Sequence, residues 1–147
     1  MANWYCGAFF MKVINGVSYV LGVTVKRFPG SVKPIGGCGE LPENYIMTLI
    51  REFFEETDKI LSPTKYYQVH QEKIGDHVRN FFLVTEISGS IMPGEGIEVT
   101  EKDEDLLTVK LWKIEEFNKK LFFKARPAFI KACEKMRELN PEFTFKP

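Results

Sequence analysis

Two hydrophobic segments near the start of the chain are joined by an Asn-Gly pair. Residues Trp4 to Val13 are rich in aromatic and β-branched side chains, and Val17 to Arg27 have the same character. The pair between them, Asn15-Gly16, is a strong signal for a tight turn. The pattern predicts a β-hairpin, followed by a loop over the Pro- and Gly-rich residues Pro29 to Gly39.

The pattern becomes helical from Pro42 to about Thr57. Proline suits the first turn of a helix because its missing N–H would have no partner there. Apolar residues then recur at spacings of three and four, which is typical of an amphipathic helix. They are Tyr45, Ile46, Leu49, Ile50 and Phe53. The sequence therefore predicts a helix with one buried face.

The second half of the chain alternates between apolar segments and polar loops. After a break at Ser62-Pro63, strands are predicted over Tyr66 to Lys73, Val78 to Ile87 and Leu106 to Trp112. A polar loop is predicted from Ser88 to Asp105, a short helix from Glu115 to Leu121 and a final helix from Pro127. Strands on both sides of one central helix, with another helix at the end, predict a mixed sheet covered on two faces.

Length and composition narrow the class of protein. The 147 residues fit one domain, covering residues 1–147. Twenty basic residues balance twenty acidic ones, which gives no reason to expect nucleic acid or an anionic membrane as a partner. The chain has no signal-peptide pattern or transmembrane-length apolar stretch, so we expect a cytoplasmic protein. Its three cysteines, Cys6, Cys38 and Cys133, lack a C-x-x-C pair and fit reduced thiols.

Three carboxylates cluster at the end of the predicted central helix. Glu52, Glu55 and Glu56 stand at positions i, i+3 and i+4, so their side chains project from one face and repel each other. A cation between them would explain the cluster. Carboxylate oxygens suit a hard ion of octahedral preference, which favours Mg²⁺ or Mn²⁺. The Gly-rich loop before the helix permits close approach to an anionic ligand.

This segment resembles the Nudix box, G-x5-E-x7-R-E-U-x-E-E-x-G-U, in which U is a bulky apolar residue. The matching residues are Gly37, Glu43, Arg51, Glu52, Phe53, Glu55 and Glu56. Six of these seven positions, all except that of Phe53, require one particular residue. A chance match at all six is on the order of one in ten million per starting position. The box runs from Gly37 to Lys59 and departs from the pattern at two positions. Asp58 replaces a Gly and Lys59 an apolar residue, and Asp tolerates the left-handed helix exit better than most residues.

The resemblance implies an α/β/α sandwich with a mixed sheet, the box as a loop–helix–loop, and a C-terminal helix. It implies that Mg²⁺, or Mn²⁺, is held by the carboxylates of the box helix and by one loop carbonyl. These groups belong to Glu52, Glu55, Glu56 and Gly36. The resemblance further implies that Arg51 and Glu43 orient the loop and the helix, with Gly37 as a structural residue.

The resemblance also implies the reaction: Mg²⁺-dependent cleavage of a phosphoanhydride in a nucleoside diphosphate linked to another moiety, with a lean towards nucleoside triphosphates. The catalytic set would comprise Glu52, Glu55 and Arg51. A carboxylate accepts a proton from the attacking water. This carboxylate belongs either to the box helix or to the later acidic loop. In that loop Glu104 is our candidate among Glu98, Glu101, Asp103, Glu104 and Asp105.

Several alternatives stay open at this point. Lys33 and Arg27 are candidate phosphate ligands, and each could instead be solvated. The chain could be a nucleotide-binding or regulatory module without turnover, or a hydrolase of ADP-ribose or nucleotide sugars. A diphosphate isomerase is disfavoured because the His/Cys metal ligands expected there are not evident. The expected partner is a small nucleotide, without nucleic acid or membrane, and a homodimer is left open.

Overall fold

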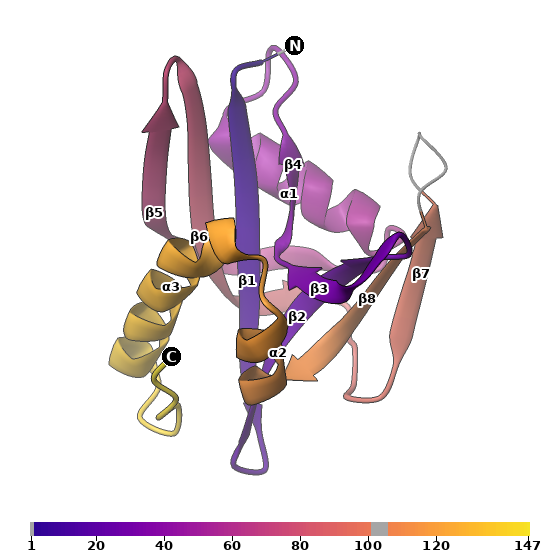
Figure 1. Cartoon of the computed structure of the whole chain (residues 1–147), viewed down its shortest axis with the longest axis vertical. Coiled ribbons are helices and arrows are strands. Elements are labelled where there is room, and N and C mark those ends of the chain that lie inside the picture. The colour runs from indigo at the N-terminus through magenta and orange to yellow at the C-terminus, as the bar shows by residue number, and fades with distance from the viewer. Residues whose placement is uncertain (1, 101–105) are drawn as a thin grey trace.

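The computed structural model describes residues 2–100 and 106–147, which form eight strands and three α-helices (Figure 1). The strands are β1 (Trp4–Ile14), β2 (Val17–Val25), β3 (Phe28–Lys33), β4 (Ile35–Cys38), β5 (Ser62–Ile74), β6 (His77–Ser88), β7 (Gly96–Thr100) and β8 (Leu106–Lys113). The helices are α1 (Tyr45–Glu56), α2 (Ile114–Lys120) and α3 (Arg126–Leu139), and a 3₁₀ turn, Phe123–Ala125, precedes α3.

The strands form one mixed sheet in the order β5-β6-β1-β2-β8-β7. β1 runs parallel to β6 and antiparallel to β2 and β4. Along the edge of β1 opposite β6, residues Tyr5 to Ala8 pair with β4 and residues Met11 to Ile14 pair with β2. β3 pairs with β2, and its Val32 also forms an isolated parallel bridge with Leu121. The chain passes directly from the end of β3 at Lys33 to the start of β4 at Ile35. It does so near the place where the partner of β1 changes from β4 to β2.

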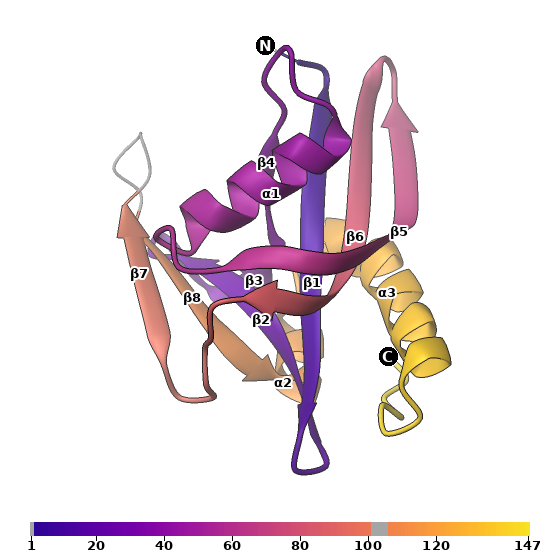
Figure 2. The ribbon, with the colours of Figure 1, turned by 180° about the vertical axis from the view of Figure 1, so that it is seen from behind.

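Helices cover both faces of the sheet, as Figures 1 and 2 show from opposite sides. On one face, Leu49 and Phe53 of α1 lie in a hydrophobic cluster with Phe82 of β6. On the other face, Phe117 of α2 and Phe129 of α3 pack against the strands. This is the predicted α/β/α sandwich. Among the described residues, no helix is long and apolar enough to cross a membrane.

Two predicted loops contain strands. β3 and β4 occupy most of Pro29 to Gly39, and β7 lies within Ser88 to Asp105. The composition of Pro29 and Gly30 suggested a loop, but both residues are exposed in the part of β3 that pairs with β2 on one side, where the missing N–H of Pro costs no sheet hydrogen bond. The predicted break at Ser62-Pro63 is also wrong, because β5 begins at Ser62.

The central helix begins at Tyr45, three residues after Pro42, where the sequence predicted its start. Asn44 is the N-cap, and its side-chain oxygen accepts a hydrogen bond from the Met47 backbone N–H at 2.9 Å. Such a cap satisfies an N–H that has no partner within the helix. Pro42 therefore lies in the turn before α1. The predicted end of the helix is close to the observed one, since α1 ends at Glu56 and Thr57 is its C-cap.

Candidate functional site

Two of the three helix carboxylates lie against the backbone of β4. The Gly36 N–H donates a hydrogen bond of 2.9 Å to Glu56 Oε1, and the Glu56 side chain is buried. A methyl group built on Gly37 would lie 2.6 Å from Glu52 Oε1, closer than real contacts allow. The missing side chain of Gly37 therefore leaves room for the Glu52 carboxylate against the strand, which any larger residue would obstruct.

The hydrogen-bond alternation of β4 determines which of its groups face away from β1. The Gly39 N–H donates to the Trp4 carbonyl at 2.9 Å, so in an antiparallel pair Gly37 also faces β1, while Gly36 and Cys38 face outward. Two contacts agree with this: Gly36 donates to Glu56, and the Cys38 carbonyl accepts from Arg51 Nη2 at 3.0 Å. The Gly36 carbonyl therefore points to the same open edge as its N–H.

Arg51 links the loop before α1 to the carboxylates at its end. Its Nε donates to Glu43 Oε2 at 2.6 Å, and its Nη2 donates to Glu43 Oε1 at 3.1 Å. Its Nη1 donates to Glu52 Oε1 at 2.7 Å and to Glu55 Oε2 at 3.3 Å. The guanidinium thus holds three carboxylates that would otherwise repel one another.

Glu43 accepts hydrogen bonds from three different residues. Besides Arg51, it accepts hydrogen bonds from the Glu40 backbone N–H at 2.9 Å and from Thr48 Oγ1 at 3.0 Å. The hydrogen bonds from Arg51 are the main reason why the pKa of Glu43 is lowered to about 2. Glu43 is therefore ionised throughout the neutral range, and its contacts connect the loop after β4 with the first turns of α1.

The chemistry of this donor set fits Mg²⁺, because carboxylates and a backbone carbonyl are hard oxygen ligands. The conformation shown is a different one: Glu52 and Glu55 both bond to Arg51 Nη1, and Glu56 bonds to Gly36. Within residues 2–100 and 106–147, no three His, Cys, Asp or Glu side chains are arranged to hold a metal ion. In this conformation Arg51 occupies one oxygen of Glu52 and one of Glu55, so it would compete with a cation for these two carboxylates.

The exit of α1 explains both departures from the box. Asp58 has φ 53° and Lys59 φ 60°, so two consecutive residues are left-handed. Left-handed Asp58 agrees with the expectation for a residue that replaces Gly. Ile60, the nearest apolar residue in the sequence, is exposed, and fully buried Leu61 supplies the apolar contact instead. Because Lys59 is also left-handed, the first buried apolar residue after α1 is Leu61 rather than Ile60.

Tyr5, which the sequence placed only within a predicted strand, lies next to this site. The Tyr5 ring lies over Gly7, and a methyl group on Gly36 would lie 2.8 Å from Tyr5 Cζ. Arg79 lies 5.7 Å from the centre of the ring. The pKa of Tyr5 is raised, first by burial and then by the negative charge of Glu56. Only the pairing of β1 with β4 brings these residues together, so no local sequence pattern could have revealed the contact.

The two candidate phosphate ligands line one cavity. Its volume is about 510 Å³, and it is lined by Val23, Val25, Arg27, Phe28, Ser31, Lys33 and Phe122. Lys33 ends β3, three residues before Gly36. A strand rises roughly 3.3 Å per residue, so the two Cα atoms lie within about 10 Å. The candidate base Glu104 lies outside the described residues, as do Glu101, Asp103 and Asp105.

No protein-family model matches the sequence, and no curated protein matches it. Solved structures do match. The MutT NUDIX hydrolase from Burkholderia pseudomallei is 21% identical, with a TM-score of 0.64 over 88% of this chain and 96% of that one. The NUDIX domain of Shewanella oneidensis NrtR, in complex with ADP ribose, is 16% identical, with a TM-score of 0.65 over 92% and 89%.

A C. elegans Ap4A hydrolase is 13% identical, with a TM-score of 0.55 over 81% of this chain and 85% of that one. Because these identities are low, the likeness concerns the path of the backbone and the order of the elements. It agrees with the mixed sheet between α1 and the α2–α3 layer described above. This chain therefore has the fold of the Nudix hydrolases.

Proposed function

We propose that this protein is a Mg²⁺-dependent pyrophosphohydrolase that cleaves a phosphoanhydride in a nucleoside diphosphate linked to another moiety. The observation that carries the proposal is the arrangement at β4. Glu52 and Glu56 lie against the glycine pair, while Gly36 presents its carbonyl to the same edge. These are the oxygen donors expected from the box, gathered from two elements of a Nudix fold.

In this proposal, Glu52, Glu55 and Glu56 hold the cation together with the Gly36 carbonyl. When bound, Mg²⁺, or Mn²⁺ in its place, supplies positive charge that offsets the charge developing on the phosphate oxygens. Arg51 and Glu43 keep the end of α1 in register with the loop. Arg51 Nη1 donates to both Glu52 and Glu55. If one of these carboxylates turns to the metal ion, the guanidinium keeps its contact with the other.

A carboxylate must accept a proton from the attacking water, and we assign this role to Glu104. Glu104 belongs to the acidic segment that connects β7 with β8. Glu104→Gln should lower the maximal rate far more than it weakens substrate binding. Its neighbours provide matched controls: Glu98, Glu101, Asp103 and Asp105. If Glu104→Gln is no worse than these, the base is Glu52 or Glu55.

The second candidate is a nucleotide-binding module without turnover. Two observations favour it: Arg51 already neutralises Glu52 and Glu55, and one similar structure is a NUDIX domain complexed with ADP ribose. ADP-ribose and nucleotide-sugar hydrolysis remain within the first proposal as alternatives to our lean towards nucleoside triphosphates. A binding module should bind nucleotides without changing them.

A screen of nucleotides with Mg²⁺ separates these functions. The panel contains nucleoside triphosphates, ADP-ribose, nucleotide sugars and a dinucleoside polyphosphate, and the products are resolved by chromatography. A hydrolase releases a nucleoside monophosphate with pyrophosphate or a second phosphate ester, and EDTA abolishes this release. Binding without any product favours the module. Rearranged product without uptake of water indicates an isomerase.

A further inference from the structure

The two glycines of β4 are contacted from opposite faces of the sheet, because consecutive residues of a strand point to opposite faces. A methyl group on Gly37 would meet the carboxylate of Glu52, on the face that carries α1. A methyl group on Gly36 would lie 2.8 Å from Tyr5 Cζ. Tyr5 packs against the hydrophobic cluster on the face that carries α2 and α3. Gly36 is therefore supported from that face by the Tyr5 ring.

A missing side chain in β1 lets the Tyr5 ring reach β4. Tyr5 pairs with Cys38, which lies two residues after Gly36. Gly7 is the residue that pairs with Gly36, so the Tyr5 ring crosses Gly7 to reach its diagonal neighbour. A methyl group on Gly7 would lie 2.9 Å from Tyr5 Cε1. An aromatic ring packed over a glycine compensates for the side chain that the glycine lacks.

Arg79 of β6 packs on the Tyr5 ring. Its guanidinium lies 5.7 Å from the centre of the Tyr5 ring and 5.4 Å from that of the Phe81 ring, and the two ring centres are 5.8 Å apart. Arg79 Nη1 pairs with Glu72 Oε2 at 3.5 Å, and His70 Nε2 lies 3.1 Å from the other oxygen of this carboxylate. A planar cation that packs on two rings and is bound to a carboxylate restricts the movement of the Tyr5 ring.

We propose that Tyr5 is a positioning residue for the cation site, and that its ring acts through the Gly36 carbonyl. This role rests on the proposed function, in which that carbonyl is a metal ligand. β4 bonds to β1 along one edge, while the Gly36 carbonyl faces the other edge. Two adjacent glycines have more conformational freedom than other residues, and a ligand that moves freely binds a metal ion more weakly. The Tyr5 ring limits this freedom before the cation arrives.

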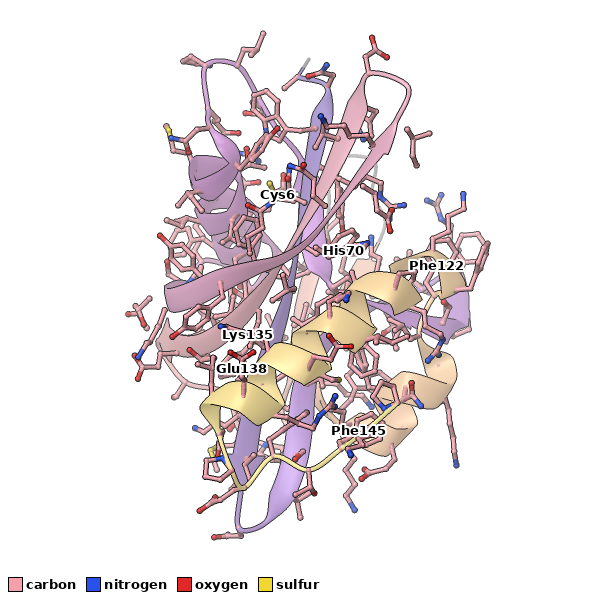
Figure 3. All side chains as sticks on the ribbon, turned by 90° about the vertical axis from the view of Figure 1, so that its left-hand side faces the viewer. Cys6, His70, Phe122, Lys135, Glu138 and Phe145 are labelled. Atoms are coloured by element: carbon pink, nitrogen blue, oxygen red, sulfur yellow. The ribbon has the colours of Figure 1, made fainter. Side chains whose placement is uncertain are left out.

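The test is the affinity of the full chain for Mg²⁺, by calorimetry, and for Mn²⁺, by electron paramagnetic resonance, without nucleotide. Tyr5→Leu removes the ring and should weaken metal binding about tenfold or more, whereas Tyr5→Phe keeps the ring and should change it less than about threefold. Phe145→Leu is the matched control, because Phe145 is also a half-buried ring packed against the same cluster. In Figure 3, Phe145 lies below α3, whereas His70, at the far end of the Tyr5 contacts, lies above it. Phe145→Leu should leave the affinity unchanged.

Arg79→Lys provides a second probe, which decides the question if Tyr5→Leu does not fold. It keeps the positive charge but loses the planar group on the two rings, so it should weaken metal binding about threefold.

Wild-type affinity in Tyr5→Leu, or in Arg79→Lys if Tyr5→Leu unfolds, overturns the proposal. So does a loss in Tyr5→Phe or in Phe145→Leu as large as that in Tyr5→Leu. Metal binding by wild type that is insensitive to Tyr5 rejects this role alone, whereas wild type that binds neither ion rejects the cation site as well. Metal binding that depends on Tyr5, without cleavage of any nucleotide, rejects the hydrolase alone.

Discussion

The backbone N–H of Gly36 donates a 2.9 Å hydrogen bond to Glu56 Oε1, and this bond joins the last turn of α1 to β4. Glu56 is only 3% exposed, so its carboxylate depends on protein donors for part of its solvation. The same strand residue is in close contact with the Tyr5 ring on the opposite side. Gly36 is therefore enclosed by the sheet below and the helix carboxylate beside it.

Replacing Gly36 by Ala should destabilise the protein by about 1–3 kcal/mol, because the methyl group would meet the Cys6 carbonyl and the Tyr5 hydroxyl. Gly30→Ala is the control, since a methyl group there meets nothing within 4 Å. It should alter stability by less than about 0.5 kcal/mol. Urea unfolding of both variants measures the difference. Equal stability of the two would refute the enclosure of Gly36.

Arg51→Ala should destabilise the metal-free protein by about 3 kcal/mol, because Glu43, Glu52 and Glu55 would lose their common cation. Lys120→Ala, which breaks an exposed pair with Glu116, should cost less than about 1 kcal/mol. The informative comparison is melting with and without millimolar Mg²⁺. We expect Mg²⁺ to stabilise wild type, by about 2.7 kcal/mol at ~100 times its dissociation constant, and to stabilise Arg51→Ala more.

The second half of that expectation follows from competition, since in wild type Arg51 and the cation would share the Glu52 and Glu55 carboxylates. Removal of the guanidinium removes the competitor. If Mg²⁺ and Mn²⁺ shift the melting temperature of neither protein, these carboxylates are not a metal site. An equal shift in both proteins would show that the ion binds without exchanging with Arg51.

Glu43 should make the folded protein sensitive to acid. Its folded pKa of about 2 lies below the ordinary value of 4.5, so its stabilisation is complete above about pH 4.5 and is lost as the pH falls towards 2. We expect Glu43→Gln to be less stable than wild type by about 2 kcal/mol at pH 7, with the gap narrowing below pH 4.5. Urea unfolding at pH 7, 5 and 3 measures the gap. A gap that is constant with pH would contradict this reading of Glu43.

The helix and its carboxylates were predictable because their signal is local. Spacings of three and four correctly place Leu49 and Phe53 on the buried side of α1, but Ile50, which belongs to the same pattern, is 37% exposed. β4 was missed because its partner is distant in the sequence, as in the pairing of Cys6 with Gly37. β3 and β7 pair with the strands next to them in the sequence and were missed because their Pro, Gly and polar residues resemble a loop. For such strands, composition is a weak guide and tertiary pairing decides.

The same distinction applies within the site. The box assigned Glu52, Glu55 and Glu56 to one helix face, but their contacts with Gly36, Gly37 and Arg51 depend on how β4 enters the sheet. Tyr5 reaches Gly36 only through the register of β1 with β4. The sequence also does not show which apolar residue after the box is buried: Leu61 is buried and Ile60 is exposed, because two left-handed residues precede them.

Those two residues provide a graded test of helix termination. Asp58 and Lys59 are both left-handed, a conformation that costs roughly 1–2 kcal/mol for an ordinary side chain and less for Asp. Lys59→Gly should therefore stabilise the protein more than Asp58→Gly, by about 1 kcal/mol against a few tenths. Thermal melting compares them, and turnover should be unchanged in both. A larger gain in stability from Asp58→Gly would contradict the larger conformational cost that we assign to Lys59.

The most direct test of catalysis by these carboxylates is the turnover of the Glu56→Gln and Glu55→Gln variants. It is measured with a nucleotide that wild type cleaves, over a range of Mg²⁺ concentrations. Each change removes a charge with little change in volume, and the amide oxygen that replaces the Glu56 carboxylate could still accept the Gly36 N–H. We expect both variants to fold, with unfolding free energies near that of wild type, and to lose turnover by orders of magnitude at every Mg²⁺ concentration. Near-wild-type turnover in both would contradict Mg²⁺-dependent hydrolysis at this site.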